Sequence, residues 1–284
     1  MKKINKASIV YSSTRSTDKT LDEVLIEIEN AGSRIESITS LGKIKNKKIK
    51  NKFSSSDLII VIGGDGTMIG SIRELYTFGI PFVGINLGRV GFLTDIYPKK
   101  LFALKEVLKG KFLKEKRPIY KAFFSNKNQE IFINEVVIHS GSIAKMVDLE
   151  LSSENEKIYN LNADGLIIST STGSTAYSYS GGGPIVSPEL NALSLLPMFS
   201  HSSSSHSLVM PNDKNLNVKI KSRKLTDPKV VVDGKKNLTY SKAGLEISNL
   251  KKYFYLLHPK DYNYYEACRT KLGWALPIDK LKND

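Results

Sequence analysis

The segment that decides the fold of the N-terminal half is Leu58-Ile59-Ile60-Val61-Ile62-Gly63-Gly64-Asp65-Gly66-Thr67-Met68. Its first five residues form an uninterrupted apolar run, which is typical of a strand buried on both faces of a parallel sheet. The stretch from Thr67 to Leu75 suits a helix that follows directly. Glycines at such a junction let backbone N–H groups approach an anion closely, and a helix N-terminus favours phosphate. The segment therefore predicts a phosphate-binding turn in an α/β fold.

The carboxylate of Asp65 is the unusual feature of this turn. An acidic side chain is poorly matched to phosphate alone. It suits a base that takes a proton from an attacking hydroxyl, or a group that helps to hold a metal ion beside the phosphates. An ordinary Gly-Asp-Gly turn at a strand end is the other interpretation, and the turn alone leaves both open.

Short apolar runs alternate with helical patterns up to about residue 117. Predicted strands are residues 7–11, 58–62 and 81–85, and predicted helices are residues 21–28 and 98–108. Thr17 and Asp18 are candidate N-caps for the first helix. Such alternation favours a parallel sheet with flanking helices.

From about residue 118 to 258 the pattern changes to short strand-like runs separated by turn residues, as in an antiparallel or mixed β domain. The tail from Asp261 to Leu272 is helical again. We therefore expect an α/β domain with a parallel sheet over residues 1–117, joined by a C-terminal helix in residues 261–284. A β-rich domain over residues 118–260 follows it, with the active site between the two.

Composition sets the cellular context. Hydrophobic residues make up 40% and charged residues 25% of the 284, which is ordinary for a soluble globular protein. No apolar stretch approaches the ~20 residues that span a bilayer, and no signal-peptide segment follows the basic N-terminus. The single cysteine, Cys268, cannot form an internal disulfide, which fits a reducing compartment. We expect a cytoplasmic protein with no membrane association.

The net charge of +14 raises the question of nucleic-acid binding. The densest basic run, residues 43–52, has six lysines interleaved with Asn and Ile, but neither Arg nor aromatic residues accompany it. A solvated loop explains this run better than a nucleic-acid site does. A basic field would still concentrate small polyanions such as ATP or dinucleotides. We therefore expect no nucleic-acid partner.

Several common motifs are absent. There is no G-x-x-x-x-G-K-[ST], so a Walker-type phosphate loop is excluded, and the lack of G-x-S-x-G weakens any hydrolase hypothesis. The glycines at positions 64, 66 and 70 miss the G-x-G-x-x-G spacing by one residue. The four histidines lack metal-ligand spacing, so no metal ligand is assigned.

A second informative segment begins at Asn162-Ala163-Asp164-Gly165 and continues through a strand into Ser169-Thr170-Ser171-Thr172-Gly173-Ser174-Thr175-Ala176-Tyr177-Ser178. Crowded hydroxyl groups after a strand could bind sugar hydroxyls or a base edge. Ala176 would allow close backbone approach, and Tyr177 offers a flat apolar face. A Ser/Thr-rich turn that caps a short helix over residues 175–180 explains the same residues equally well.

A third candidate is the polar pair Asn134-Glu135, which interrupts an otherwise apolar strand-like run. Such a pair is either a β-bulge or a pair of ligand-facing residues.

Together these segments resemble the NAD kinase family, over most of residues 57–274. Residues 61–67 are similar to the GGDGT motif of that family, and residues 84–94 to its GxNLGxxGFL segment. Asn134-Glu135 matches the NE/D motif, and residues 172–178 match TGSTAYS. GGDGT alone is shared with lipid kinases, whereas the ordered set is far more specific. Residues 195–199 look most like the enzymes of Gram-negative bacteria.

The resemblance implies phosphoryl transfer from ATP to NAD with Mg²⁺, and a homodimer or homotetramer. Asp65 would be the general base for the 2′-hydroxyl of the adenosine ribose. Implied phosphate-binding residues are Gly63, Gly64, Gly66 and Thr67. Implied dinucleotide-binding residues are Asn134, Glu135, Asp164, Thr175, Ala176, Tyr177, Ser178 and Ser180, with Lys145 and Asn162 at more variable positions and Asp233 with Lys235 in a DGQ-like turn.

The sequence also departs from the family pattern. Ser171 replaces a proline, Lys235 replaces the polar amide of DGQ, and residues 202–207 replace PLSxRP, so that His206 stands for an arginine. A neutral histidine would order a nearby loop more weakly than arginine. The alternatives are a catalytically weak NADP-binding sensor, a GGDGT-type lipid or sugar kinase, and a basic nucleic-acid binder. The choice between ATP and polyphosphate as donor stays open.

Overall fold

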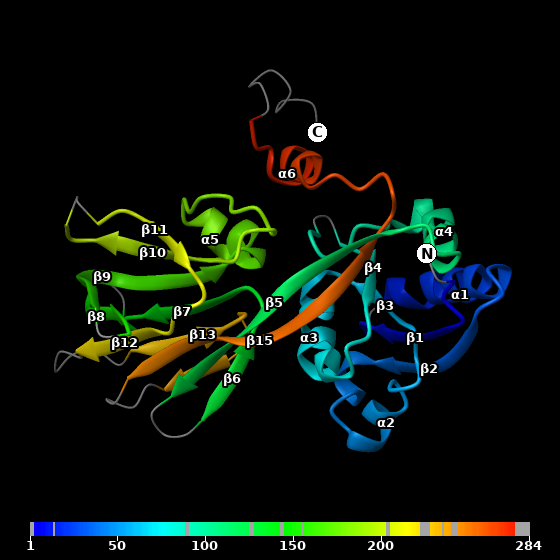
Figure 1. Ribbon diagram of the computed structural model, residues 1–284, viewed down its shortest axis with the longest axis horizontal. Helices are drawn as coiled ribbons and strands as arrows, with labels where there is room; N and C mark the ends of the chain where they lie inside the picture. The colour runs from blue at the N-terminus through cyan, green and yellow to red at the C-terminus, as the bar shows by residue number, and fades with distance from the viewer. Residues whose placement is uncertain are drawn as a thin grey trace. The chain divides into compact units, whose positions relative to one another are not determined.

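The structure is a computed structural model that describes residues 3–13, 15–88, 91–124, 128–142, 145–154, 156–202, 205–221, 228–234, 236–239 and 244–275. The chain divides into two units, which are residues 1–116 with 253–284 (unit 1) and residues 117–252 (unit 2). Two long strands, β5 (Leu113–Phe124) and β15 (Leu245–His258), each belong partly to one unit and partly to the other (Figure 1).

Unit 1 is an α/β unit around a parallel sheet, as the sequence predicted. Its elements are β1 (Lys6–Tyr11), α1 (Arg15–Asn30), β2 (Arg34–Ser40), η1 (Leu41–Lys43), α2 (Lys47–Asn51), β3 (Leu58–Gly63), α3 (Asp65–Leu75), η2 (Tyr76–Phe78), β4 (Phe82–Asn86), η3 (Pro98–Lys100), α4 (Phe102–Leu108) and α6 (Tyr264–Leu272). The strand order is β2-β1-β3-β4, and the end of β15 pairs with β4; all these pairs are parallel.

The core of unit 1 lies on both faces of this sheet, because all six residues of β3 are buried. On one face, side chains of β1 and β3 share a cluster with Val24 and Ile28 of α1 and with Leu104 and Val107 of α4. On the other face α3 contacts β3 and β4. The fully apolar run in the sequence is therefore explained by two-sided burial.

Three local predictions in unit 1 are corrected by the structure. Helix α1 begins before Thr17, whose buried hydroxyl donates to the Ser12 carbonyl at 2.6 Å instead of capping the helix. Part of the lysine run expected as loop forms α2, because the Asn46 side chain caps it by accepting from Lys48 N at 3.0 Å. The tail helix starts at Tyr264, where the Asn263 side chain accepts from the Glu266 N–H.

Unit 2 is rich in antiparallel strands, again as predicted. Its further elements are β6 (Gln129–Phe132), β7 (Glu135–His139), β8 (Val147–Ser153), β9 (Glu156–Thr170), η4 (Thr172–Thr175), α5 (Tyr177–Ser180), β10 (Ala192–Ser200), β11 (Leu208–Pro211), β12 (Leu216–Lys221), β13 (Lys229–Val232) and β14 (Lys236–Thr239). The order β14-β13-β7-β9-β8-β12-β15 forms the main path, and β10 pairs with β9.

The long strand β9 organises unit 2. One stretch of β9 pairs with β8, while the stretch that ends at Thr170 lies between β7 and β10. Alternate side chains of these strands, such as Val136, Ile138, Leu166 and Ile168, enter one large buried cluster. The end of β9 thus delivers the hydroxyl-rich segment 169–178 beside the start of β7, where Glu135 pairs with Ser169.

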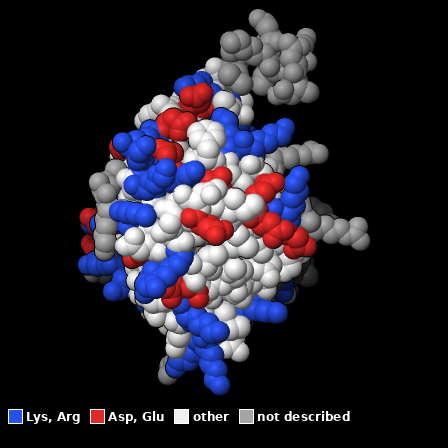
Figure 2. Space-filling model, turned by 90° about the vertical axis from the view of Figure 1, so that its right-hand side faces the viewer, with Lys and Arg blue, Asp and Glu red and all other residues white. Residues whose placement is uncertain are grey.

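Charge on the face drawn in Figure 2 is mixed, with acidic side chains between basic ones and no single basic patch. Among the described residues, no helix is long and apolar enough to cross a membrane.

Candidate functional site

The first group of expected site residues, the Asp65 turn (Gly63 to Thr67), joins β3 to α3. Gly63 ends the strand and Gly64 is the N-cap of the helix, whose first residue is Asp65. A Cβ on Gly63 would lie 2.5 Å from the Thr67 Oγ1, so only glycine fits at this position. The turn therefore has the strand-to-helix geometry that the glycines predicted.

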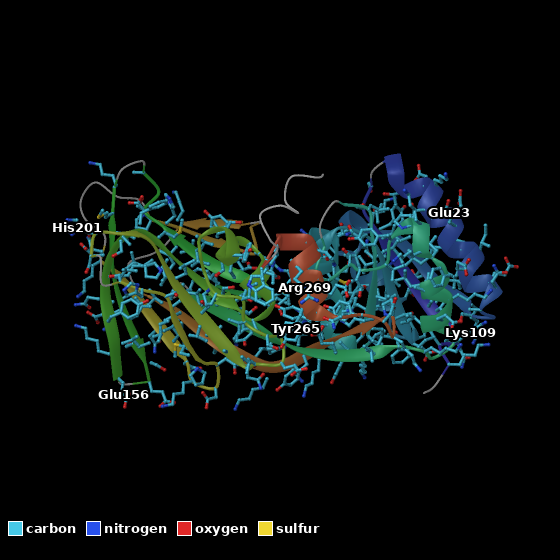
Figure 3. The ribbon with its side chains drawn as sticks, turned by 90° about the horizontal axis from the view of Figure 1, so that it is seen from above. Glu23, Lys109, Glu156, His201, Tyr265 and Arg269 are labelled. Atoms are coloured by element: carbon cyan, nitrogen blue, oxygen red, sulfur yellow. The ribbon has the colours of Figure 1, made fainter. Side chains whose placement is uncertain are left out.

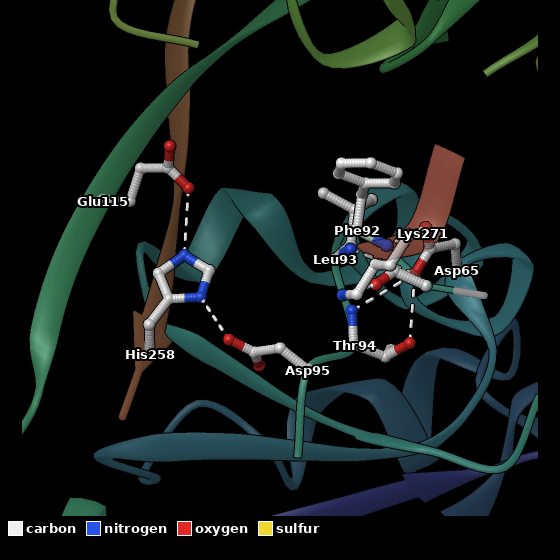
Figure 4. Close-up of polar contacts among 9 residues, drawn as sticks. Asp65, Phe92, Leu93, Thr94, Asp95, Glu115, His258 and Lys271 are labelled. Atoms are coloured by element: carbon white, nitrogen blue, oxygen red, sulfur yellow. Dashed lines mark hydrogen bonds and ion pairs between the residues drawn. The ribbon is translucent and has the colours of Figure 1, made fainter. Parts of the chain in front are cut away.

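The carboxylate of Asp65 is held by the loop that follows β4 (Figure 4). Its Oδ1 accepts from the backbone N–H groups of Leu93 at 3.0 Å and Thr94 at 3.2 Å, and from the Thr94 hydroxyl at 3.0 Å. Its Oδ2 accepts from the Phe92 N–H at 2.7 Å. Oδ1 thus accepts three donors and Oδ2 accepts one, so Oδ2 is the oxygen with room to accept a further hydrogen bond from a ligand.

Two polar side chains beside the Asp65 turn were not predicted. Lys271 of α6 donates through Nζ to the Gly91 carbonyl, and its ammonium lies 5.4 Å from the centre of the Phe92 ring. Burial lowers the pKa of Lys271, although the negative charges of Asp95 and Asp65 counteract this. Lys271 thus brings a partly buried amine close to the turn. Nothing in the local sequence pattern links it to Asp65, since α6 lies near the other end of the chain.

The other residue is Asn86 at the end of β4. It is 1% exposed, and its Nδ2 is without a hydrogen-bond partner, while its Oδ1 accepts from the Gly88 N–H at 2.7 Å. Asn86 belongs to residues 84–94, which resemble the GxNLGxxGFL segment, and this match is the signal in the sequence that could have identified it.

The second group, the Glu135 cluster, lies in unit 2 and comprises Asn134, Glu135, residues 170–178 and Asp233. The Asp233 carboxylate accepts from the backbone N–H groups of Ile133, Asn134 and Glu135, at 2.8 to 3.2 Å. Asp233 has a left-handed backbone, with φ of 46°. The polar pair therefore lies at a strand boundary, which corrects the β-bulge interpretation: residues 133 and 134 form the break between β6 and β7, and Glu135 starts β7.

The carboxyl group of Glu135 is buried at the centre of this cluster. Burial and the negative charge of Asp233 raise its pKa to about 8, and a hydrogen bond from the Tyr177 backbone N–H only partly offsets them. At neutral pH the group is therefore mostly protonated. It can donate one hydrogen bond to a ligand and accept others.

The 170–178 segment closes the cluster. The Thr170 hydroxyl donates to the Ile133 carbonyl at 2.6 Å, and the Thr170 N–H donates to the Asn134 carbonyl at 2.9 Å. Several buried oxygens here have no hydrogen-bond partner; they are Glu135 Oε2, Ser171 Oγ, Thr172 Oγ1 and Ser178 Oγ. Buried polar atoms are normally paired, so a group of unpaired ones indicates a surface that binds a polar ligand. Tyr177 leaves its ring about half exposed beside them.

The remaining expected residues lie apart from this cluster. Lys145 is exposed before β8, and Asn162 and Asp164 lie on β9. Asn162 is eight residues before Thr170, or about 26 Å along an extended strand. It donates to the Asp148 carboxylate, and its carbonyl accepts from the N–H of His201, which Figure 3 labels. Asn162, Asp148 and His201 border a cavity of about 360 Å³, and Asn160, Ser202 and Lys221 also line it.

The structure therefore assembles three groups. Gly63 to Thr67 lie together in unit 1; Asn134, Glu135, Asp233 and the segment from Thr175 to Ser178 with Ser180 lie together in unit 2; Lys145, Asn162 and Asp164 form a separate group. Lys235 lies outside the described residues.

Comparison with known proteins identifies the family. The ATP-NAD kinase N-terminal domain family matches residues 8–112, and the ATP-NAD kinase C-terminal domain family matches residues 133–256. An NAD kinase from Acinetobacter baylyi is 40% identical over 234 residues, which cover 80% of this chain and 75% of the relative. The chain belongs to the NAD kinase family. An NAD kinase from Azotobacter vinelandii is 37% identical over 262 residues, or 90% of this chain and 85% of the relative.

The architecture agrees with that of a solved NAD kinase. The crystal structure of an NAD kinase from Archaeoglobus fulgidus in complex with ATP matches with a TM-score of 0.74 at 25% identity, and covers 94% of this chain and 97% of the other. The predicted fold class, an α/β N-terminal part with a β-rich part after it, is confirmed.

Proposed function

We propose that this chain transfers the γ-phosphoryl group of ATP to the 2′-hydroxyl of the adenosine ribose of NAD, which yields NADP and ADP. Membership of the NAD kinase family supports the reaction. The structural observation that carries the proposal is the Glu135 cluster, where buried hydroxyl and carboxyl oxygens without partners gather beside a half-exposed tyrosine ring. Sugar hydroxyls and a base fit such a surface.

Asp65 is the proposed base. The acceptor position that remains on its Oδ2 receives the proton of the 2′-hydroxyl, the ribose oxygen attacks the γ-phosphorus in line, and the bond to the ADP oxygen breaks. The four donors from Phe92, Leu93 and Thr94 fix the orientation of the carboxylate before the substrate arrives. A positioned base contributes ~10²–10⁴-fold, and positioning of the substrates contributes more.

The divalent ion is proposed to enter with ATP as part of the substrate. In the described part of the chain, no group of three or more His, Cys, Asp or Glu side chains is arranged to hold a metal ion. Mg²⁺ commonly keeps most of its ligands from phosphate and water, so a site made by protein side chains alone is not required. The N-terminus of α3, which begins at Asp65, would supply backbone donors for phosphate oxygens.

We assign ATP to the domain of residues 1–117 with 261–284, and the dinucleotide to the domain of residues 118–260. Glu135, as a neutral carboxyl, would donate to a ribose hydroxyl, with Asn134 beside it and Asp233 holding the backbone of both. Tyr177 would stack on a ring. The Lys235 side chain would meet the added phosphate of the product.

We also propose a homo-oligomer, which the position of the third group supports. Asn162 and Asp164 lie too far along β9 from the Glu135 cluster to serve one small site with it, and Lys145 precedes β8, which pairs with the same stretch of β9. We propose that they contact the dinucleotide bound by a neighbouring copy in a dimer or tetramer. Cytoplasmic location is proposed on the single cysteine.

The test is direct. The full chain is incubated with NAD, ATP and Mg²⁺, and NADP is detected with an NADP-specific dehydrogenase while ADP is measured in parallel. We expect equal amounts of NADP and ADP. NADP binding without any NADP formation would leave the sensor hypothesis in place and overturn the kinase proposal. Parallel reactions with polyphosphate and with NADH define the donor and acceptor.

A further inference from the structure

Unit 1 contains a buried histidine to which the proposed reaction gives no part. His258, at the end of β15, is 2% exposed, and both of its ring nitrogens face carboxylates. Nδ1 lies 2.7 Å from Asp95 Oδ2 and Nε2 lies 2.9 Å from Glu115 Oε2 (Figure 4). The ring also stacks on Tyr262, with centroids 4.0 Å apart. We call His258, Asp95 and Glu115 the His258 cluster.

The geometry defines the charge of this ring. A carboxylate only accepts hydrogen bonds, so each ring nitrogen must donate, and only the imidazolium has two N–H groups. Burial alone would lower the pKa of His258, but the hydrogen bonds and charges of Asp95 and Glu115 outweigh it and raise the pKa. Lys271 also lies near the cluster, where its charge interacts with that of Asp95.

The His258 cluster is connected to Asp65 through Thr94, the residue that precedes Asp95. Asp95 directly follows Thr94, which donates to the Asp65 carboxylate through both its N–H and its hydroxyl. The next residue, Ile96, is fixed to β4, because its carbonyl accepts from the Asn86 N–H at 2.7 Å. The loop that orients Asp65 is thus fixed at two points, which are the Ile96 carbonyl and the Asp95 side chain held by His258.

We propose that His258 is a positioning residue for phosphoryl transfer, which acts by holding Asp95 and Glu115 together and so fixing the loop of Phe92, Leu93 and Thr94 around the Asp65 carboxylate. This inference rests on the proposed function, in which Asp65 is the base. A misplacement of about 1 Å at a reacting group can cost ~10²-fold in rate, so a loosened loop should be visible in kcat.

The kinetic test uses two variants and a matched control. In His258→Gln a neutral side chain with one amide nitrogen cannot donate to both carboxylates, and in Glu115→Gln one acceptor loses its charge. We expect kcat to fall about 10–100-fold in each, with the KM for NAD and for ATP within about 3-fold of wild type. Glu106→Gln makes the same chemical change in an exposed ion pair of unit 1, with Lys111, and should leave kcat unchanged. Unchanged kcat in the first two variants would overturn the proposal.

A double-mutant cycle separates positioning from general damage to the fold. If His258 acts through Asp65, then His258→Gln should lower kcat by less than about 3-fold in an Asp65→Asn background. An undiminished effect in that background would contradict the proposal.

A measurement on the wild-type chain needs neither a variant nor activity. As pH rises, the ring signals of His258 and the backbone amide signals of Phe92, Leu93 and Thr94 should move with one shared midpoint in NMR spectra. Independent titration of the amides would overturn the positioning role. Failure to form NADP would instead overturn the proposed function, so the two failures are distinguishable.

Discussion

Glu135 and Asp233 are joined by two hydrogen bonds: the Asp233 N–H donates to the Glu135 carbonyl at 3.0 Å, and the Glu135 N–H donates to the Asp233 carboxylate at 3.2 Å. This pairing brings the Asp233 carboxylate, which accepts from three backbone N–H groups, close to the Glu135 carboxyl group, whose Oε2 has no hydrogen-bond partner. The two acidic side chains therefore have different roles. Asp233 is the anion that holds the backbone, and Glu135 carries a proton near neutral pH because burial and Asp233 raise its pKa to about 8.

The raised pKa predicts how stability depends on pH. The folded pKa lies above the ordinary value of 4.5, so the folded state binds the proton more tightly than the unfolded state. The contribution of Glu135 to the free energy of unfolding is fully present below about pH 4.5 and is lost as pH rises through about 8. In Glu135→Gln, which mimics the neutral acid, this decline should disappear. Thermal unfolding followed from pH 5 to pH 9 measures this decline. At about 1.4 kcal/mol per pKa unit, we expect the free energy of unfolding of the wild type to fall by a few kcal/mol.

Glu156→Gln is the matched control for this experiment, because Glu156 is exposed at the start of β9 (Figure 3). Its pH profile should follow that of the wild type. A Glu135→Gln profile that falls between pH 5 and pH 9 as steeply as the wild type would show that Glu135 ionises normally.

Sequence patterns predicted the parts of the fold that rest on strong periodicity. The strand at residues 58–62 is unambiguous because both of its faces are buried. Strand β2 (Arg34–Ser40) was missed, since it lies at the sheet edge and exposes Ile35 and Ile38, which blurs the apolar pattern. The start of α1 was also misplaced, because an N-cap residue and a buried threonine look alike in sequence.

Site residues that lie close together in the sequence could be predicted, whereas those that the fold brings together from distant segments could not. The Asp65 turn and the 170–178 segment are continuous, so their motifs could be recognised. His258 and Lys271 reach the Asp65 loop from β15 and α6, and no spacing rule connects positions so far apart. The separation of Asn162 from the Glu135 cluster could likewise not be predicted, because it depends on the length of β9.

Asp65→Asn should retain NAD binding and lose most turnover, by ~10²–10⁴-fold, because the amide cannot take the proton of the 2′-hydroxyl. NADP formation gives the rate, and calorimetry gives the affinity for NAD. Asp57→Asn is the control, since the Asp57 carboxylate also accepts two backbone N–H groups, from Asn5 and Lys6, at the opposite end of β3. It should keep the wild-type rate per folded molecule. Near-normal turnover in Asp65→Asn would remove Asp65 as the base.

Gly173→Ala should disrupt the Glu135 cluster, because a Cβ at this position would lie 2.1 Å from the Asn134 carbonyl oxygen. Either the 170–178 segment or the Asn134 backbone must move, so we expect NAD affinity to fall at least about 10-fold and the free energy of unfolding to fall by about 1–3 kcal/mol. Gly42→Ala, where a Cβ meets nothing within 4 Å, is the control and should change neither quantity. Unchanged NAD affinity in Gly173→Ala would mean that the dinucleotide binds away from this cluster.

Tyr177→Ala should weaken dinucleotide binding more than ATP binding. The ring is 49% exposed, so its removal opens no cavity in the core, while the backbone N–H that contacts Glu135 is retained. Loss of one stacked ring should raise the dissociation constant for NAD by about 5–30-fold, from ~1–2 kcal/mol of contact, and leave that for ATP within about 2-fold. Phe102→Ala removes an exposed ring from unit 1 and should change neither constant. Separate titrations of each variant with NAD and with ATP make the comparison; equal losses for both ligands in Tyr177→Ala would mean that the ring does not belong to the dinucleotide site.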